Sequence, residues 1–319
     1  GYVLGIGLNL FQQSVTLADL NNQLIHRVDL GLPSVHDPEA VIGRIVEVAK
    51  NVIGRLGGDR ARLLSGAIAI TGAVDPDRGV VLQSPTLGWQ NIDIGGRLAT
   101  ALDLPMIVES LPNSLVVAES RFGIARAFKH VMLFNCALGL GAGLYADGRL
   151  VRGRNFTAGL IARLPTNDTD YPGLSLDETT AGCGVLRRLD VSPDPDGKRL
   201  TGDLEAKQLL EVLRRGADGD EKCTAAIAAA GRTLGAAMQQ FAGLMSPEMI
   251  ILSGPVAQST TFVAGVEAAT AGLFQHGIAK IPFMVSTMSP QASARWLSIG
   301  EFLVNRDLDL DALRMKEAS

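Results

Sequence analysis

The sequence predicts an α/β protein built from two related lobes that face each other across a cleft. At 319 residues, the chain exceeds the size at which a single hydrophobic core is usual, so two lobes or domains are expected. Its composition, with 47% apolar residues, 5% aromatic residues and 36 glycines, is typical of an α/β protein with many tight turns. In addition, one pattern of short strands and turns occurs twice along the chain.

Each copy of this pattern contains three short strands. The predicted strands are residues 2–8, 14–20 and 23–30 in the first copy, and 131–136, 142–146 and 149–151 in the second. A glycine-rich turn at 137–141 divides the first two strands of the second copy. Two explanations are open, because duplication of a lobe produces such a repeat and hairpins with glycine turns also recur independently.

The segments that follow each copy alternate between strand and helix patterns. Apolar residues at helical spacing predict an amphipathic helix over 38–56. Residues 75–90 are polar and rich in turn residues, so we expect a loop there. Further strands are predicted at 65–70, 106–109 and 249–254, and further helices at 91–104, 113–128, 207–215, 221–244 and 292–305. The charged end beyond residue 305 is expected to fray.

Charge, cysteine content and hydropathy exclude several classes of protein. The net charge is −4 and no long run of Lys or Arg occurs, so any DNA contact must come from a separate domain. Cys136, Cys183 and Cys223 lie far apart, which excludes a paired disulfide framework and a C-x-x-C zinc knuckle. These cysteines are interpreted as structural thiols in a reducing cytoplasm. No 18-residue apolar stretch occurs, so we predict no membrane contact.

Four long segments, in this order, resemble the ROK family (repressors, open reading frames and kinases). They are SGAIAITGAVDPDRGVVLQSPTLGW (65–89), PMIVESLPNSLVVAESRFG (105–123), GLGAGLYADGRLVRG (139–153) and LGAAMQQFAGLMSPEMIILSG (234–254). The resemblance implies a duplicated actin-like (ribonuclease H-like) ATPase fold with two lobes around a cleft. It implies an N-terminal lobe at 1–125, completed by a helix at 289–319, and a C-terminal lobe at 126–288 with sugar-cleft and dimerisation elements.

The first residues, GYVLGI, resemble the junction at which a winged helix-turn-helix passes into the sensing body of the family's repressors. They enter the first predicted strand at once, so we expect the chain to begin inside a longer natural protein. The resemblance thus implies the regulator branch of the family. DNA would be bound by an N-terminal domain that is not in this chain.

The two phosphate-binding turns of ROK kinases are altered here. Where the kinases read like D-x-G-G-T-K, residues 7–12 read GLNLFQ, so Gly7 replaces the metal-binding Asp and Phe11 replaces the Thr. In the second turn, Leu138 replaces a hydroxyl residue although glycines survive. Asn9, Gly139, Gly141 and Gly254 are therefore interpreted as vestigial phosphate turns, with ATP and magnesium lost. The alternative is that the hairpin keeps its glycines for positive φ and close backbone approach.

The catalytic base of the family is also missing. The run that resembles E-N-D-A-N is Glu109-Ser110-Leu111-Pro112-Asn113, and Leu111 in the base position cannot accept a proton. We therefore predict no catalytic residue. Pro112 suits the first turn of a helix, and Asn113 is either a helix cap or a ligand contact.

A zinc site is not expected either. The family's G-E-I-G-H motif corresponds to GLIAR (159–163), in which Leu160 replaces the sugar-binding Glu and Arg163 replaces the zinc-binding His. No Cys occurs between residues 164 and 180, so a tetrahedral zinc site lacks its ligands. The acidic residues of 168–178 are predicted to lie in a solvated loop.

Nine residues are candidates for contact with a ligand in the cleft. They are Ser84, Thr86, Trp89, Ser110, Asn113, Asn155, Arg163, Asp177 and Glu178. Asp177 stands where the family has a Glu, and it is either a hydroxyl acceptor or a residue of a helix N-terminus. Arg163 either forms a salt bridge or recognises an anionic ligand such as a sugar acid or sugar phosphate.

Together these features predict the effector-binding portion of a ROK-family transcriptional regulator that is inactive as a kinase. Its expected ligand is a small carbohydrate-like effector, and its expected assembly is a homodimer or a higher homo-oligomer. An ATP-dependent sugar kinase is the alternative function. A dimerisation scaffold that binds no effector is a third hypothesis.

Overall fold

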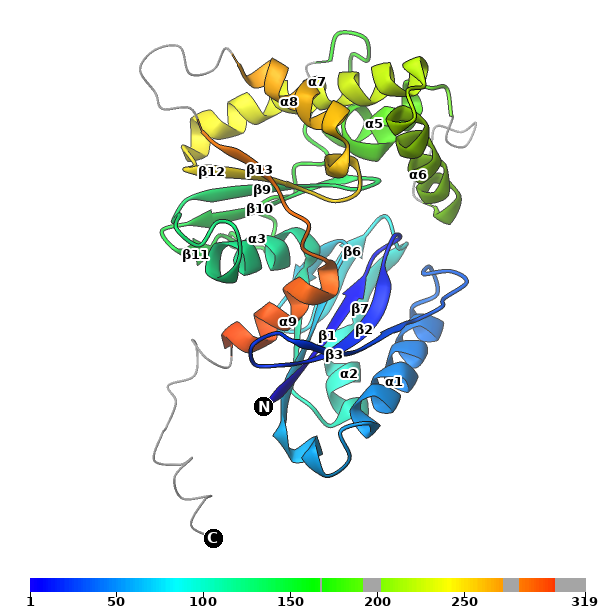
Figure 1. Cartoon of the computed structure of the whole chain (residues 1–319), viewed down its shortest axis with the longest axis vertical. Coiled ribbons are helices and arrows are strands. Elements are labelled where there is room, and N and C mark those ends of the chain that lie inside the picture. The colour runs from blue at the N-terminus through cyan, green and yellow to red at the C-terminus, as the bar shows by residue number, and fades with distance from the viewer. Residues whose placement is uncertain (167, 192–201, 272–280, 302–319) are drawn as a thin grey trace.

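Two five-stranded mixed sheets form the centres of two lobes, one above the other in Figure 1. This computed structural model describes residues 1–166, 168–191, 202–271 and 281–301. The first sheet contains β1 (Tyr2–Leu8), β2 (Gln13–Asp19), β3 (Leu24–Asp29), β4 (Leu63–Ile70) and β8 (Met106–Ser110). The second contains β9 (Val131–Cys136), β10 (Leu140–Ala146), β11 (Arg149–Leu150), β12 (Met249–Ser253) and β13 (Phe283–Val285).

The two sheets share one topology. Their strand orders are β3-β2-β1-β4-β8 and β11-β10-β9-β12-β13. In each sheet the first strand of the repeat pairs antiparallel with the second and parallel with the fourth, and the fourth pairs parallel with the fifth. This shared arrangement confirms both the duplication and the predicted actin-like α/β fold.

Helices cover the first sheet on both faces, which explains the continuous apolar runs of β1 and β4. On one face lie α1 (Pro38–Gly54) and α2 (Ile94–Leu102). The sequence predicts α1 well because Asp37 caps it, accepting hydrogen bonds from the amides of Glu39 and Ala40. On the other face, α3 (Leu111–Phe122) and α9 (Pro290–Gly300) lie between the two sheets.

Helix α9 packs against β1 and β4 although it comes from the far end of the chain. Its Arg295 is buried against β2, where the guanidinium donates to the Thr16 hydroxyl and to the Asn22 side-chain oxygen. Burial lowers the pKa of Arg295 to about 10, so the group stays charged at neutral pH. The sequence prediction places this helix at 292–305, and residues beyond 301 lie outside the described part of the chain.

A third sheet occupies the segment predicted as a loop. It consists of β5 (Ala73–Asp75), β6 (Val80–Ser84) and β7 (Trp89–Asp93), paired antiparallel in sequence order. The prediction was wrong here because Gly79 and Gly88, both with positive φ, form turns between short strands. It also started the next helix too early, since Asp93 caps the amide of Gly96 and α2 begins at Ile94.

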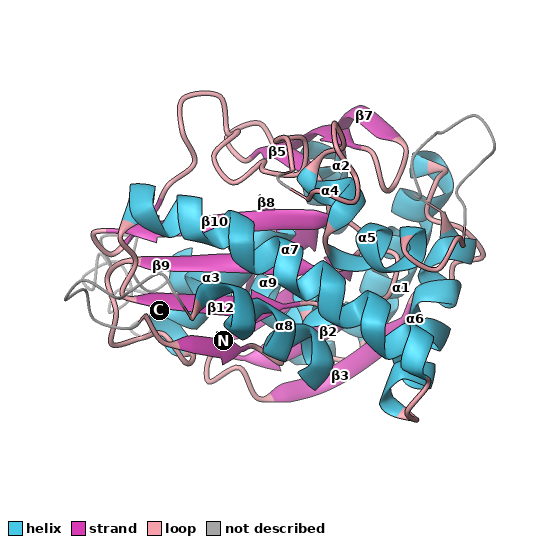
Figure 2. Cartoon of the chain, turned by 90° about the horizontal axis from the view of Figure 1, so that it is seen from above, coloured by secondary structure: helices cyan, strands magenta, loops and turns pink. Residues whose placement is uncertain are grey.

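Five of the described helices belong to the second lobe, and the longest of them lies on its outer face (Figure 1). They are α4 (Leu176–Thr179), α5 (Ala181–Arg187), α6 (Asp203–Ala217), α7 (Glu221–Met245) and α8 (Thr260–Thr270). Short 3₁₀ turns also occur at Gly57–Arg62 in the first lobe and at Val256–Gln258 in the second. Figure 2 shows α7 and α8 side by side across the sheet. Helix α8, which was not predicted, packs closely against α7. The contact is possible because Gly231 has no side chain, since a Cβ atom there would lie 2.3 Å from the Phe262 carbonyl oxygen. None of the described helices is long and apolar enough to span a membrane.

The acidic segment before α4 is not simply a solvated loop. The side chain of Asp168 is buried, pairs with Arg188 at the end of α5, and accepts a hydrogen bond of 2.7 Å from the Thr233 hydroxyl on α7. Tyr171 lies over the same guanidinium, with 5.1 Å between the ring centroid and Cζ. This network, which sequence spacing could not reveal, ties the segment to two helices.

One buried carboxylate holds the two chain connections between the lobes. Glu119, near the end of α3, accepts a hydrogen bond of 2.9 Å from the Ile124 amide, in the connection to β9. It also accepts one from the hydroxyl of Ser286, in the return segment between β13 and α9. The hydrogen bond from the Ile124 amide to the Glu119 side chain lies just beyond the end of α3 at Phe122, which comes before the predicted end at residue 128.

We expect Glu119→Ala to lower the free energy of unfolding by about 3 kcal/mol, because it leaves the partly buried Ile124 amide and the buried Ser286 hydroxyl without this acceptor. Urea denaturation measures this loss. The exposed Glu267→Ala on α8 is the control and should change stability by less than about 0.5 kcal/mol. Equal losses in the two variants would contradict the role of Glu119.

Candidate functional site

A cavity of about 650 Å³ lies between the lobes. It is lined by the segments that follow β1, β4, β8, β9 and β12. The carboxyl ends of parallel strands are where open α/β sheets bind ligands. The volume falls within the range of roughly 300–1,000 Å³ that is usual for small-molecule sites.

Five of the nine candidate ligand residues line this cavity. They are Thr86, Ser110, Asn113, Arg163 and Asp177. The four residues interpreted as vestigial phosphate turns, Asn9, Gly139, Gly141 and Gly254, line it as well. The structure therefore brings together residues from both halves of the sequence at one site.

Ser84 and Trp89 are buried in the first lobe and do not line the cavity. The Trp89 side chain is 2% exposed and its indole N–H donates to the Val35 carbonyl at 3.0 Å. Ser84 is fully buried and its hydroxyl accepts from the Leu87 amide. Their expected contact with a ligand is corrected to a packing role.

Asn155 and Glu178 also lie outside the cavity lining. Asn155 is exposed in the segment that follows β11. Glu178 completes a capping box at α4, since its carboxylate accepts from the amide and hydroxyl of Ser175. It is also within 3.6 Å of Arg187, so the geometry gives it a structural role.

The first phosphate turn is satisfied by its own side chain. The Asn9 carboxamide oxygen accepts hydrogen bonds from the amides of Phe11 at 2.7 Å and Gln12 at 2.8 Å. Backbone N–H groups of such turns are the donors that cradle phosphate. Because Asn9 already uses two of them, and Leu10 and Phe11 face the cavity, the turn does not fit a nucleotide phosphate.

Gly7, in place of the kinase Asp, lies against the first turn of α9. A Cβ atom there would lie 2.9 Å from the Gln291 amide nitrogen and 2.9 Å from the Pro290 Cβ. No carboxylate can be accommodated at position 7 unless α9 moves. The residues present therefore do not fit a magnesium–ATP complex held as in a kinase.

The second turn is occupied by an internal carboxylate. Asp177, in the first turn of α4, accepts a hydrogen bond of 2.7 Å from the Leu140 amide. Asp177 is thus a residue of a helix N-terminus, as one interpretation proposed, and it also lines the cavity, as the other requires. Its negative charge opposes phosphate at this turn.

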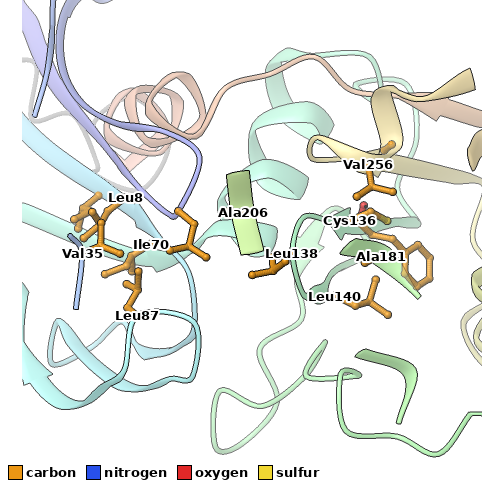
Figure 3. Close-up of a cluster of buried hydrophobic side chains, with 14 of the residues drawn as sticks. Leu8, Val35, Ile70, Leu87, Cys136, Leu138, Leu140, Ala181, Ala206 and Val256 are labelled. Carbon is orange, nitrogen blue, oxygen red and sulfur yellow. Dashed lines mark hydrogen bonds between the residues drawn. The ribbon is translucent and has the colours of Figure 1, made fainter. Parts of the chain in front are cut away.

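The surviving glycines of the second turn are explained by close packing. A Cβ on Gly139 would lie 2.8 Å from the Asp177 carboxylate, and one on Gly141 would lie 2.9 Å from the Pro112 ring. Neither residue has a positive φ, so that part of the structural explanation was wrong, whereas Gly254 does adopt one, at 89°. Figure 3 shows Leu138, the residue in place of the hydroxyl, between buried side chains of the two lobes.

Leu111, at the position that resembles the catalytic base, is apolar, and the nearby carboxylate of Glu109 already has three partners. Leu111 is 4% exposed. Glu109 accepts from the Ser110 amide and the Asn113 side chain, and it pairs with Arg152 at 2.8 Å. Among the described residues at this end of α3, no carboxylate lines the cavity.

Asn113 is not the helix cap that one interpretation proposed. Ser110 holds the N-cap position of α3, and Pro112 lies in the first turn as predicted. A carboxylate only accepts hydrogen bonds, so the Asn113 NH₂ group must face Glu109, at 3.0 Å. Its carboxamide oxygen then has no donor among the described residues, although the residue is buried in the cavity wall.

Arg163 is exposed and lines the cavity. It makes no ion pair or hydrogen bond with any residue that the structure describes. The described residues therefore give no support to the salt-bridge interpretation. Arg163 supplies a cation to the cavity.

Several lining residues were missed from the sequence, and they are Thr71, Gln83, Asn135, Gln258 and Thr287. Thr71 and Asn135 could have been found, because they lie at the carboxyl ends of β4 and β9. Gln83 comes from the small sheet, Gln258 from the 3₁₀ turn after β12 and Thr287 from the return segment, and the positions of all three depend on the tertiary fold. No group of three His, Cys, Asp or Glu side chains close enough to hold a metal occurs among the described residues.

Comparison with known proteins decides the family, because the ROK family pattern matches residues 4–297. The chain belongs to the ROK family.

Its curated relatives include regulators. The chain is 20% identical over 260 residues to the xylose repressor of Caldicellulosiruptor bescii, covering 79% of this chain and 65% of the repressor. It is 23% identical over 266 residues to the DNA-binding transcriptional dual regulator NagC of Escherichia coli (81% and 64% covered). It is 28% identical over 258 residues to a transcriptional regulator of Mycobacterium tuberculosis (79% and 58% covered). The chain thus spans less than two thirds of each of these relatives.

Solved structures of both kinases and a regulator share this ROK fold. A glucokinase from Streptomyces griseus, in complex with glucose and AMPPNP, superposes with a TM-score of 0.74 at 18% identity, covering 93% of this chain and 97% of the kinase. A ROK transcriptional regulator described as a homologue of E. coli MLC gives 0.73 at 20% identity, covering 93% and 78%. At such identities the likeness shows the fold alone.

We expect Gly7→Ala to lower the free energy of unfolding by about 2 kcal/mol, because the added methyl overlaps the first turn of α9. The control is Gly43→Ala, at an open helical position of α1, which should raise stability by about 0.5–1 kcal/mol. Urea denaturation measures the change in the free energy of unfolding and shows whether it falls in Gly7→Ala and rises in Gly43→Ala. A neutral Gly7→Ala would show that α9 can be displaced easily.

Proposed function

We propose that this chain is the effector-binding body of a ROK-family transcriptional regulator and that it transfers no phosphate. One observation carries the proposal: side chains of the protein itself, Asn9 and Asp177, accept hydrogen bonds from amides of the two phosphate turns. The apolar Leu111 in the base position and the blocked space at Gly7 support it. The regulators among the relatives support it too.

The proposed effector is a small carbohydrate-like molecule bound between the lobes. The names of the relatives include a xylose repressor and an N-acetylglucosamine repressor. In this chain Thr86 and Ser110 come from the first lobe and Arg163 from the second, so one ligand can contact both. The unpaired oxygen of Asn113 provides a buried acceptor for a hydroxyl.

Binding would act by changing the angle between the lobes. A ligand that contacts both lobes favours the arrangement in which those contacts form together. The two connections joined at Glu119 would serve as the pivot. We propose that closure repositions DNA-binding domains carried by the full-length protein, within a homodimer.

We expect at least one compound from a panel of sugars, sugar acids and sugar phosphates to raise the melting temperature, since a ligand that binds only the folded state stabilises it. Asn113→Ala should weaken or abolish this rise. The matched control is Asn155→Ala, at an exposed position outside the cavity. If every compound leaves the melting temperature unchanged, the effector role fails and a scaffold without an effector is favoured.

We expect no sugar-dependent ADP release from the protein. We also expect none from the double variant Gly7→Asp/Leu111→Asp, because α9 fills the space at residue 7 and the turn amides remain occupied. A coupled assay with a ROK glucokinase as positive control measures this. Turnover above background by the unaltered protein would establish the kinase alternative.

A further inference from the structure

The charged side chains at and near the cavity differ in whether they have partners within the protein. Glu109 and Asp177 are both engaged, the first by Arg152 and the second by the Leu140 amide. Arg163 lines the same cavity, and no described residue pairs with it. Arg163 therefore has no ion-pair partner among the described residues, although Asp177 keeps its negative charge at the second turn. A guanidinium of this kind matches two acceptor oxygens of a carboxylate or a phosphate.

The cavity also exposes large apolar side chains from both lobes. Leu160 and Leu210 are each 49% exposed, and both line the cavity. Other apolar residues of the lining include the partly exposed Phe11 of the first lobe and Phe156 of the second. Since sugar hydroxyls lose hydrogen bonds when they are buried against such surface, a bare sugar would complement it poorly.

These two features lie close together in the chain. Leu160 and Arg163 belong to one segment, three residues apart, after the β10–β11 hairpin. Leu210 reaches the cavity from α6. The volume of about 650 Å³ leaves room for an acid group and an apolar group on one ligand.

We infer that the effector is an anionic sugar derivative that carries an apolar substituent. Arg163 binds its acid group, Leu160 and Leu210 contact the substituent, and Asn113 accepts a sugar hydroxyl. This inference rests on the proposed function and names the ligand class of the same site. The acid group is a carboxylate or a phosphate, and the experiment separates these sources.

Isothermal titration calorimetry with matched compounds tests the ligand class. The panel contains phenyl glycosides of hexuronic acids, the neutral phenyl hexosides, free hexuronic acids and hexose phosphates, each in the gluco, galacto and manno series. We expect a phenyl glycoside of a hexuronic acid to bind at least about tenfold more tightly than its neutral counterpart, and more tightly than the free acid. Tighter binding of hexose phosphates than of free hexuronic acids would support recognition of the anion and identify phosphate as its source.

Variants assign the two parts of the ligand to their side chains. Arg163→Gln should weaken binding of acid-bearing compounds by about tenfold or more and leave neutral compounds unchanged. Its control is Arg154→Gln, at an exposed position of the same segment that does not line the cavity. Leu210→Ser should weaken only the phenyl compounds, and Leu204→Ser, at an exposed position of the same helix outside the cavity, is its control.

The failures of the two proposals are distinguishable. Neutral sugars that bind as tightly as their acid counterparts, with no effect of Arg163→Gln, would overturn this inference and leave the effector role intact. Absence of heat and of any melting shift for every compound would overturn both.

Discussion

The contact between α9 and β1 is the constraint on which both the fold and the site depend. The helix comes from the far end of the chain and lies so close to the strand that Gly5 and Gly7 have no room for side chains, with Arg295 and Gln291 in the way. This packing completes the first lobe and places α9 between the two sheets. It also leaves no room for a carboxylate at residue 7 unless α9 moves.

The two turns that resemble the phosphate turns of ROK kinases are stabilised in similar ways. In the first, the Asn9 carboxamide accepts from two amides, and in the second the Asp177 carboxylate accepts from the Leu140 amide. A buried amide needs an acceptor, and an internal one makes the turn stable without a ligand. The hairpins therefore persist as structural elements, with glycines kept for close packing, while the cavity beside them offers apolar side chains and Arg163.

Elements with a strong local pattern could be predicted, and elements that depend on distant partners could not. The strands at 2–8 and 131–136 and the helix at 221–245 match the prediction because apolar periodicity and caps lie within the segment itself. The small sheet at 73–93 was missed because short strands are stabilised by pairing with one another. Helix α8 was missed because its packing surface is made by the glycines that it shares with α7.

By itself, the sequence determined the family and the α/β fold, and it placed residues such as Leu111 at positions that resemble kinase motifs, because residue identity at a motif position is visible without coordinates. Only the tertiary structure decided which polar groups reach the cavity. Trp89 is held by its hydrogen bond to the Val35 carbonyl, and Glu178 is held by Ser175 and Arg187, whereas Arg163 has no such partner among the described residues. Side-chain direction follows from the neighbours that each group meets after folding, and those neighbours are far away in the sequence.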